Sequence, residues 1–402
     1  MLIISSLQIL AMNYLKFAVG LDVAKDTFDA CLSVIDDQQR VTVTTRFNFP
    51  NTPKGFANLL AWTSKNAKLP IPVVYLMEAT GIYYEQLAWF LHGKRRTVSV
   101  VLPNKAKKYK ESLGLKSKTD RIDARGLAQM ACEQNHDPWK PASENLYLLR
   151  IITRQIQNCC EQSTVHSNQL HALQHGRIRD KAIEKMQSSH IALLQKHKAA
   201  LELKLRTMIS SDKFLAQKFE KISRIKGLGV NCLAVLVAET NGFLSFENSA
   251  QLVSYAGYDV IANESGKHKG KTRISKKGNS RIRRALHFPA LNVVRYNVGP
   301  FRDLYTRVYE RSKIKMKAYT AVQKKLLQII YAVWKNNQDF VNTKAKNTSG
   351  DNELVPSFAP TPAELEKITP GIMTRGKQDR HPSKIRRMPS FAESKVRKKS
   401  AE

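Results

Sequence analysis

The sequence predicts an α/β protein with a mixed sheet covered by helices, a long helical spacer and a second, mainly α-helical domain. Apolar, strand-like runs alternate with amphipathic segments in the first 140 residues. Residues 143–222 contain no proline and repeat apolar side chains at helical spacing, and a new apolar and basic region begins near Ile222. The chain has 402 residues, enough for two or three domains with sizeable cores.

Positive charge dominates the composition. There are 66 Lys and Arg against 33 Asp and Glu, a formal net charge of +33, and the pI is near 10.0. Such a chain favours a polyanionic partner; nucleic acid is the default and a membrane surface is the competitor. No run of eighteen apolar residues occurs, so we expect no membrane span. The five cysteines show no metal-ligand spacing, which is typical of a reduced, cytosolic protein.

Strands and helices alternate in the first region. The elements that we expect, in chain order, are strands at 17–21, 27–34 and 40–49, a helix at 53–62, a strand at 73–77, a helix at 83–91, a strand at 98–102 and a helix at 121–133. Three leading strands followed by strands that alternate with helices are typical of a ribonuclease H-like sheet. The apolar segment 1–15 lacks the basic start of a signal peptide, and Met12 is a second candidate start.

Four acids stand at the ends of these elements. Asp22 ends the first strand and Glu78 ends the fourth, at the carboxyl edge where open α/β sheets keep their sites. Asp120 and Asp123 are three residues apart, so a helix that begins there presents both on one face. A lone acid at a strand end is usually a turn or capping residue. A set of four is much harder to explain in that way.

Crowded carboxylates repel one another unless hard cations lie between them. Mg²⁺ prefers oxygen ligands, and a pair of such ions suits phosphodiester chemistry. We therefore expect the four acids to hold two Mg²⁺ ions, with Mn²⁺ as the alternative. Asp26 and Asp29 lie close to Asp22 in sequence and are the competing candidates there. Glu85 competes with Glu78, but we expect it to be an exposed helix residue.

Two basic segments are candidate phosphate contacts. The first immediately precedes the Asp120 and Asp123 pair, and its candidates are Lys105, Lys107, Lys108, Lys116 and Lys118. The second has nine Lys or Arg and no acid between residues 266 and 284, with three glycines that favour a loop. Its candidates are Lys267, Lys269, Lys271, Arg273, Lys276, Lys277, Arg281, Arg283 and Arg284. A solvated basic surface is the plainer alternative for both.

The spacer predicts an αα-hairpin or a coiled coil. Leu149, Ile152 and Ile156 follow one another at helical steps, and we expect a break near His175 and Gly176. Such stripes usually form core or a dimer seam, so this segment is also a candidate for self-association.

The second domain opens with a glycine-rich turn. Gly227 and Gly229 precede an apolar helix that we expect to reach Glu239, which resembles a helix-hairpin-helix. In such a turn the glycines allow close approach and helix N-terminal amides meet a phosphate. Further helices are expected from Ile282 to about Asn336, and the tail beyond them has the composition of a disordered arm.

Taken together, these motifs resemble the transposases of the insertion-sequence 110 family, kin to the Piv/MooV DNA invertases. The resemblance covers roughly residues 16–336. Its motifs are Gly20-Leu21-Asp22-Val23-Ala24-Lys25, Glu78-Ala79-Thr80-Gly81-Ile82-Tyr83, Lys118-Thr119-Asp120-Arg121-Ile122-Asp123-Ala124, Ile225-Lys226-Gly227-Leu228-Gly229, Tyr255-Ala256-Gly257, Ser265-Gly266 and Ile274-Ser275-Lys276-Lys277-Gly278-Asn279.

The resemblance implies a RuvC-like DEDD domain and a transposase domain with a nucleophilic serine. The implied DEDD residues are Asp22, Glu78, Asp120 and Asp123. The implied nucleophile is Ser265, eight residues after Gly257, with Ser275 and Ser254 as the alternatives. The chain departs from the family's Gly-Leu-x-Pro pattern, because it has Gly257-Tyr258-Asp259-Val260. The implied domains are an extra segment 1–15, a RuvC-like domain 16–140, a spacer 141–221, a transposase domain 222–340 and a tail 341–402.

The same resemblance implies the partners. They are DNA of the element's ends and target, a structured guide RNA, and further copies of the chain as a dimer or tetramer. A prokaryotic cytoplasmic location at the nucleoid follows from such partners. Two rival functions stay open: a RuvC-like nuclease that hydrolyses branched DNA with water, and a nucleic-acid-binding protein without catalysis.

Overall fold

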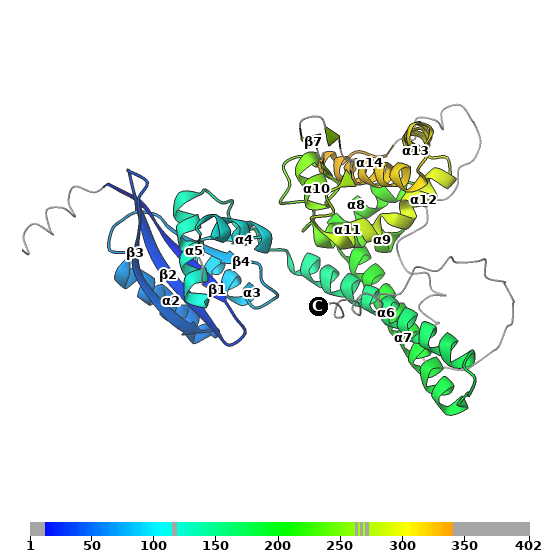
Figure 1. Cartoon of the computed structure of the whole chain (residues 1–402), viewed down its shortest axis with the longest axis horizontal. Coiled ribbons are helices and arrows are strands. Elements are labelled where there is room, and N and C mark those ends of the chain that lie inside the picture. The colour runs from blue at the N-terminus through cyan, green and yellow to red at the C-terminus, as the bar shows by residue number, and fades with distance from the viewer. Residues whose placement is uncertain (1–12, 115–118, 262–263, 266–267, 270–272, 341–402) are drawn as a thin grey trace, which may run out of the picture.

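The computed structural model describes residues 13–114, 119–261, 264–265, 268–269 and 273–340, and of 264–265 and 268–269 it describes the backbone. A sheet domain is followed by two long helices that lie side by side and then by a cluster of shorter helices (Figure 1). The expectations for the first twelve residues and for the tail 341–402 lie outside the described ranges.

The sheet domain contains five strands in the order β3-β2-β1-β4-β5. Their bounds are β1 Tyr14–Val23, β2 Thr27–Asp36, β3 Val41–Pro50, β4 Val73–Glu78 and β5 Thr97–Val101. β1 pairs antiparallel with β2 and β2 antiparallel with β3, whereas β4 runs parallel to β1 and β5 parallel to β4. This is the ribonuclease H-like mixed sheet that the sequence predicts.

Helices cover both faces of the sheet. Their bounds are α2 Pro53–Asn66, α3 Glu85–Gly93, α4 Pro103–Ser112 and α5 Asp120–Glu133. Because successive strand residues point to opposite faces, Phe17, Val19 and Leu21 pack with α2 and α3, while Ala18 packs on the other side with α4 and α5. Helix α4 is not among the elements expected from the sequence; Pro103 at its start is compatible with a helix because proline suits the first helical turn.

One glycine sets the distance between β1 and α5. A Cβ atom built on Gly20 lies 2.1 Å from the backbone nitrogen of Ala128 and 2.2 Å from the carbonyl oxygen of Ala124. Both of those residues are buried alanines. No side chain therefore separates the helix from the strand, and α5 lies directly against the strand that carries Asp22.

The spacer is a hairpin of two 31-residue helices, α6 Glu144–Gln174 and α7 Lys181–Ser211. α6 ends beside His175 and Gly176, where the sequence predicts the break. Ser143 caps α6 and Asp180 caps α7 by accepting hydrogen bonds from backbone amides of the first turn. The αα-hairpin is thus observed, whereas coiled-coil packing stays a prediction.

The second domain is mainly helical. Its helices are α8 Lys213–Ser223, α9 Val230–Glu239, α10 Ser249–Tyr255, α11 Ser280–Ala285, α12 His287–Arg295, α13 Gly299–Ser312 and α14 Lys315–Asn336. Two short ribbons, β6 Val260–Ile261 with β9 Arg273–Ile274 and β7 Glu264–Ser265 with β8 His268–Lys269, connect α10 to α11. One continuous core runs from α6 through α9 to α14, with fully buried Leu236, Phe243 and Leu326. No helix in the described ranges has the length and apolar character needed to cross a bilayer.

Replacing Gly20 should separate α5 from β1. We expect Gly20→Ala to lower the free energy of unfolding by about 3 kcal/mol, since overpacking against backbone atoms cannot be relieved by a side-chain rotation. Denaturant titration measures the change. Gly93→Ala is the matched control, because a Cβ at Gly93 meets no atom within 4 Å. Equal stability of the two variants would contradict close packing at Gly20.

Candidate active site

The four acids are positioned by the sheet and by the start of α5. The strand register pairs Leu21 with Met77, so Asp22 and Glu78 are the next residues along two adjacent parallel strands. Asp120 is the first residue of α5, and the Thr119 hydroxyl caps that helix by accepting from the Ile122 amide at 3.3 Å. Asp123, in the same first turn, is almost completely buried. Acids favour this end of a helix because its amides carry partial positive charge.

Lys110 of α4 lies between two of the acids. Its Nζ donates to Asp123 Oδ1 at 2.9 Å and to Glu78 Oε2 at 3.4 Å. The Thr80 hydroxyl donates to the other Glu78 oxygen at 3.0 Å. Burial lowers the pKa of Lys110, but the hydrogen bond and charge of Asp123, with the charges of Glu78 and Asp22, raise it above its usual value. Lys110 is therefore a protonated internal counter-charge.

The pKa of Asp22 reflects its burial and the charges of the neighbouring acids. Burial, together with the charges of Asp123, Asp120 and Glu78, raises the pKa of Asp22 to about 6, although Lys110 acts in the opposite direction. The other three acids thus lie close enough to Asp22 to act on its carboxyl group. Lys110 is not among the site residues that the sequence predicts, because nothing in its run of lysines distinguishes the residue that turns inward.

The four acids offer the oxygen donor atoms and the negative charge that a hard cation requires. Their donors are all carboxylate oxygens, which Mg²⁺ and Mn²⁺ prefer, and burial together with the neighbouring acids raises the pKa of Asp22 despite the ammonium group of Lys110. Within the described ranges no three His, Cys, Asp or Glu side chains are already grouped around one cation position. The Lys110 ammonium instead contacts two of the carboxylates.

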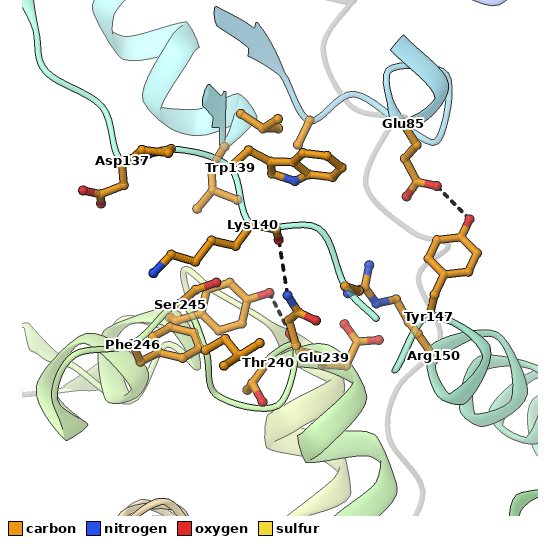
Figure 2. Close-up of a pocket in the computed structure, with 18 of the residues that line it drawn as sticks. Glu85, Asp137, Trp139, Lys140, Tyr147, Arg150, Glu239, Thr240, Ser245 and Phe246 are labelled. Carbon is orange, nitrogen blue, oxygen red and sulfur yellow. Dashed lines mark hydrogen bonds between the residues drawn. The ribbon is translucent and has the colours of Figure 1, made fainter. Parts of the chain in front are cut away.

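The competing acids have other roles. Asp29 faces Asp22 across the β1–β2 pair, and its Oδ2 accepts from Asn48 at 3.0 Å. Glu85 is half-buried rather than exposed, because its carboxylate accepts from the Tyr147 hydroxyl at 2.7 Å (Figure 2). The expectation of an exposed Glu85 is therefore wrong; the tyrosine that covers it comes from α6, 62 residues along the chain.

The serine candidates lie in and beside the ribbons. Ser265 is in β7, in the segment between α10 and α11, and its side chain is outside the described part. Ser254 is exposed on α10, whereas the Ser275 hydroxyl is buried and has no hydrogen-bond partner among the residues that the structure describes. Tyr258, at the point where the chain departs from the family pattern, is a core residue whose hydroxyl donates to Gln323 at 3.0 Å. Tyr258, which departs from the family pattern, therefore contributes to core packing.

The basic candidates divide into exposed and internally bonded residues. The exposed candidates are Lys105, Lys107, Lys108, Arg273, Lys276, Lys277, Arg281 and Arg284. Arg284 nevertheless pairs with Glu161 of α6, and Arg283 donates to the Ala256 carbonyl at 2.8 Å. Lys116, Lys118, Lys267 and Lys271 lie outside the described residues, and so does the side chain of Lys269.

The glycine-rich turn precedes α9 as expected, and α9 ends at Glu239. Gly227 has φ +97°, and a Cβ built on it would lie 2.8 Å from Cβ of Asn292 in α12. Gly229 is exposed, with open space around it. Gly227 therefore serves close helix packing, and the phosphate contact expected at the two glycines stays a prediction.

A cleft of about 600 Å³ lies between the sheet domain and the second domain. Figure 2 shows Glu85 on the sheet-domain side, Trp139 and Lys140 in the connection, and Glu239 on the second domain. None of the four acids lines this cleft. From the sequence, Glu239 is expected only to end a helix, although a buried acid at a helix C-terminus is unusual.

Comparisons with known proteins agree with this arrangement. Residues 19–175 match the DEDD-type IS110 family described as "Transposase", and residues 219–306 match "Transposase IS116/IS110/IS902 family". The pilin gene-inverting proteins of Moraxella bovis and Moraxella lacunata are each 29% identical to the chain over 331 residues, which cover 81% of this chain and 98% of the relative.

Two solved Thermus thermophilus RuvC structures, one in complex with a Holliday junction substrate, match 31% of this chain and 99% of their own. Their identities are 13% and 11%, and their TM-scores 0.24 and 0.25. The fold assignment therefore comes from the strand order described above. Because the two family matches lie in separate parts of the chain and name one family, the chain belongs to the IS110 family of transposases, enzymes that cut and rejoin DNA.

Proposed function

We propose that this transposase cuts and rejoins the DNA of its own element by metal-dependent attack of Ser265 on a phosphodiester. The observation that carries the proposal is the convergence of Asp22, Glu78 and Asp123, with Asp120 beside them, around a single lysine at the carboxyl edge of the sheet. Lys110 pairs directly with Glu78 and Asp123, so an ion pair made only for stability leaves Asp22 and Asp120 unexplained.

The four carboxylates would hold two Mg²⁺ ions, for which Mn²⁺ is a substitute. When bound, such ions polarise the scissile phosphate and stabilise the leaving oxygen. Asp22 and Glu78 are fixed by neighbouring strands, and Asp120 and Asp123 by one helix turn, so their backbone positions are set before DNA arrives. Lys110 keeps this cluster partly neutral until then.

Ser265 would supply the nucleophile. Its Oγ bonds to the scissile phosphorus, one P–O bond to the deoxyribose breaks, and the Oγ proton passes to the leaving oxygen. The resulting DNA–serine ester conserves bond energy for rejoining. Exposed basic side chains of the same segment, such as Arg273, Lys276 and Lys277, would offset negative charge that develops on phosphate.

DNA, a structured guide RNA and further copies of the chain are the proposed partners. The +33 net charge suits two nucleic acids. Self-association is supported by the spacer, where Val165, Ile183, Met186 and Leu193 expose apolar side chains on α6 and α7. A second copy would also allow a serine of one chain to meet the acids of another. We expect the enzyme to act at the nucleoid in the cytoplasm, where this DNA lies.

A second candidate is hydrolysis of DNA by water at the same acids, as in RuvC-like nucleases. The acid cluster favours it in one respect, because it is assembled within the sheet domain and its carboxylates require no residue of the second domain. The relatives' name, pilin gene-inverting protein, favours cutting coupled to rejoining instead, since inversion requires both steps.

A covalent adduct distinguishes the two candidates. Wild-type protein should keep DNA attached under denaturing conditions. The amount of this adduct should fall at least ~100-fold in Ser265→Ala and in Asp22→Ala, because each change removes a group required for attack. Ser254→Ala is the matched control and should keep the adduct. DNA cutting without an adduct, retained in Ser265→Ala, would replace the serine mechanism by hydrolysis. Cutting that survives Asp22→Ala would remove the acids from the chemistry.

Asp22→Asn should stabilise the metal-free protein. The folded-state pKa of Asp22, about 6, is above its ordinary value of 3.8, so ionisation of Asp22 weakens the fold at neutral pH. The expected gain is on the order of 1–2 kcal/mol after allowance for partial exposure. It should be full above pH 6 and fall towards zero as the pH drops to about 4. Asp26→Asn, at an exposed neighbouring site, should show no such gain in denaturant titrations at both pH values.

Lys110→Met should increase the response to Mg²⁺. Without its ammonium the acids lose their counter-charge, so the metal-free melting temperature falls, while a cation meets no competitor and binds several-fold more tightly. Thermal melts with and without Mg²⁺ measure both effects. Lys107→Met, an exposed position on the same helix, is the control. A Mg²⁺ response of Lys110→Met equal to that of wild type would mean that no cation takes the place beside Lys110.

A further inference from the structure

Glu239 is a buried acid with an unusual position. It is the last residue of α9, its exposed fraction is 7%, and it lines the cleft between the two domains (Figure 2). Carbonyl groups at a helix C-terminus repel a carboxylate, and burial removes its hydration. A carboxylate at this position therefore needs strong hydrogen-bond or ion-pair partners. The identity of those partners indicates the role of the residue.

Two groups satisfy the Glu239 carboxylate directly. Arg154 of α6 donates from Nε to Oε1 at 2.8 Å and from Nη2 to Oε2 at 3.2 Å, a bidentate pair. Asn279 donates from Nδ2 to Oε2 at 2.9 Å. Burial raises the pKa of Glu239, but the hydrogen bonds from Arg154 and Asn279 and the charges of Arg154 and Arg281 outweigh burial and lower it. Glu239 is thus ionised at neutral pH.

Asn279 uses its remaining groups to hold the start of α11 and the end of α10. Its Oδ1 accepts from the backbone amides of Arg281 and Ile282, which caps α11. Its backbone amide donates to the Tyr255 carbonyl at 2.7 Å. The Tyr255 hydroxyl in turn donates to the Glu239 carbonyl at 3.2 Å. Glu239 therefore orients an asparagine whose amide has no freedom to turn without losing the cap.

These contacts close the base of the segment that carries Ser265. The Ser275 amide donates to the Asp259 carbonyl at 2.7 Å, and the Lys276 amide donates to the Gly257 carbonyl at 3.1 Å. A Cβ built on Gly278 would lie 2.4 Å from the Tyr255 carbonyl oxygen, so only glycine allows this approach. We call the contacts between residues 255–259 and 275–279 the clasp. β7, with Ser265, lies in the chain between its two arms.

We propose that Glu239 is a positioning residue for the serine step: through Asn279 it fixes the clasp, and through Arg154 it ties the clasp to α6 of the spacer. The proposal rests on the proposed role of Ser265. Glu239 does not touch DNA or the reacting atoms. A merely structural ion pair would need Arg154 alone; the hydrogen bond to a capping asparagine at the base of the serine segment is what assigns the further role.

Reversing the polarity of one hydrogen bond tests this role. Glu239→Gln keeps an acceptor for Arg154 Nε but places an amide donor at the position of Oε2, which accepts from both Asn279 and Arg154 Nη2. Asn279→Asp keeps the cap of α11 but places a second carboxylate against Glu239. In the double variant the introduced glutamine amide can donate to the introduced aspartate carboxylate, which restores the link and the net charge.

Adduct formation, DNA affinity and thermal stability are measured on the full chain for all three variants. We expect each single variant to form the covalent DNA adduct about tenfold more slowly, with DNA affinity within about twofold of wild type, and the double variant to recover most of the rate. Lys218→Met is the matched control. It loses a buried hydrogen bond to the Trp334 carbonyl at 2.6 Å in the same core, so it should melt lower and keep its adduct rate.

Two results would overturn the proposal: an unchanged adduct rate in Glu239→Gln, or rate losses in Glu239→Gln and Lys218→Met that simply follow their losses of stability. Hydrogen exchange distinguishes a failure of the role proposed for Glu239 from a failure of the proposed serine mechanism. If wild type forms no adduct, the role of Ser265 falls, but the Ser275 and Lys276 amides should still exchange several-fold faster in Glu239→Gln than in Lys218→Met. Equal exchange at those amides would reject the clasp as the element that Glu239 holds.

Discussion

The direct packing of α5 on β1 is the constraint on which the acid cluster depends. With no side chain at Gly20, the helix backbone approaches the strand closely enough for Asp123 to share Lys110 with Glu78. Parallel pairing of β1 and β4 supplies the other fixed distance, because it brings Asp22 and Glu78 to one edge. Backbone contacts set both relationships, so the positions of the carboxylates do not depend on flexible loops.

Because the carboxylates of the cluster lie close together, they also repel one another. Burial and three neighbouring acids raise the pKa of Asp22, and one lysine offsets only part of the negative charge. A cluster selected only for stability would replace such acids with apolar or neutral groups. The presence of these acids therefore indicates that a bound cation relieves the repulsion.

The second domain treats its buried acid in the opposite way. Glu239 has a bidentate arginine and an amide donor, and its pKa is lowered rather than raised. The two sites therefore differ in what they require. The acids of the sheet domain need a further positive partner, whereas the hydrogen bonds of Glu239 are satisfied and hold Asn279 and Arg154 in place. Arg154 joins Glu239 to the spacer, and Tyr147 of the same helix joins Glu85 of the sheet domain, so α6 contacts both regions that the chemistry would use.

The sequence by itself determined the kind and order of the elements. Apolar runs gave the strands of the sheet, the proline-free stretch gave the spacer hairpin, and acids at strand ends gave Asp22 and Glu78 as candidates, since each of these signals resides in a few neighbouring residues. Only the tertiary structure selected Lys110 from its run of lysines, bonded Arg283 to the Ala256 carbonyl, and joined Glu239 to Asn279. Those contacts link residues 13, 27 and 40 positions apart. Strand register and helix packing decide such distances, and no local periodicity encodes them.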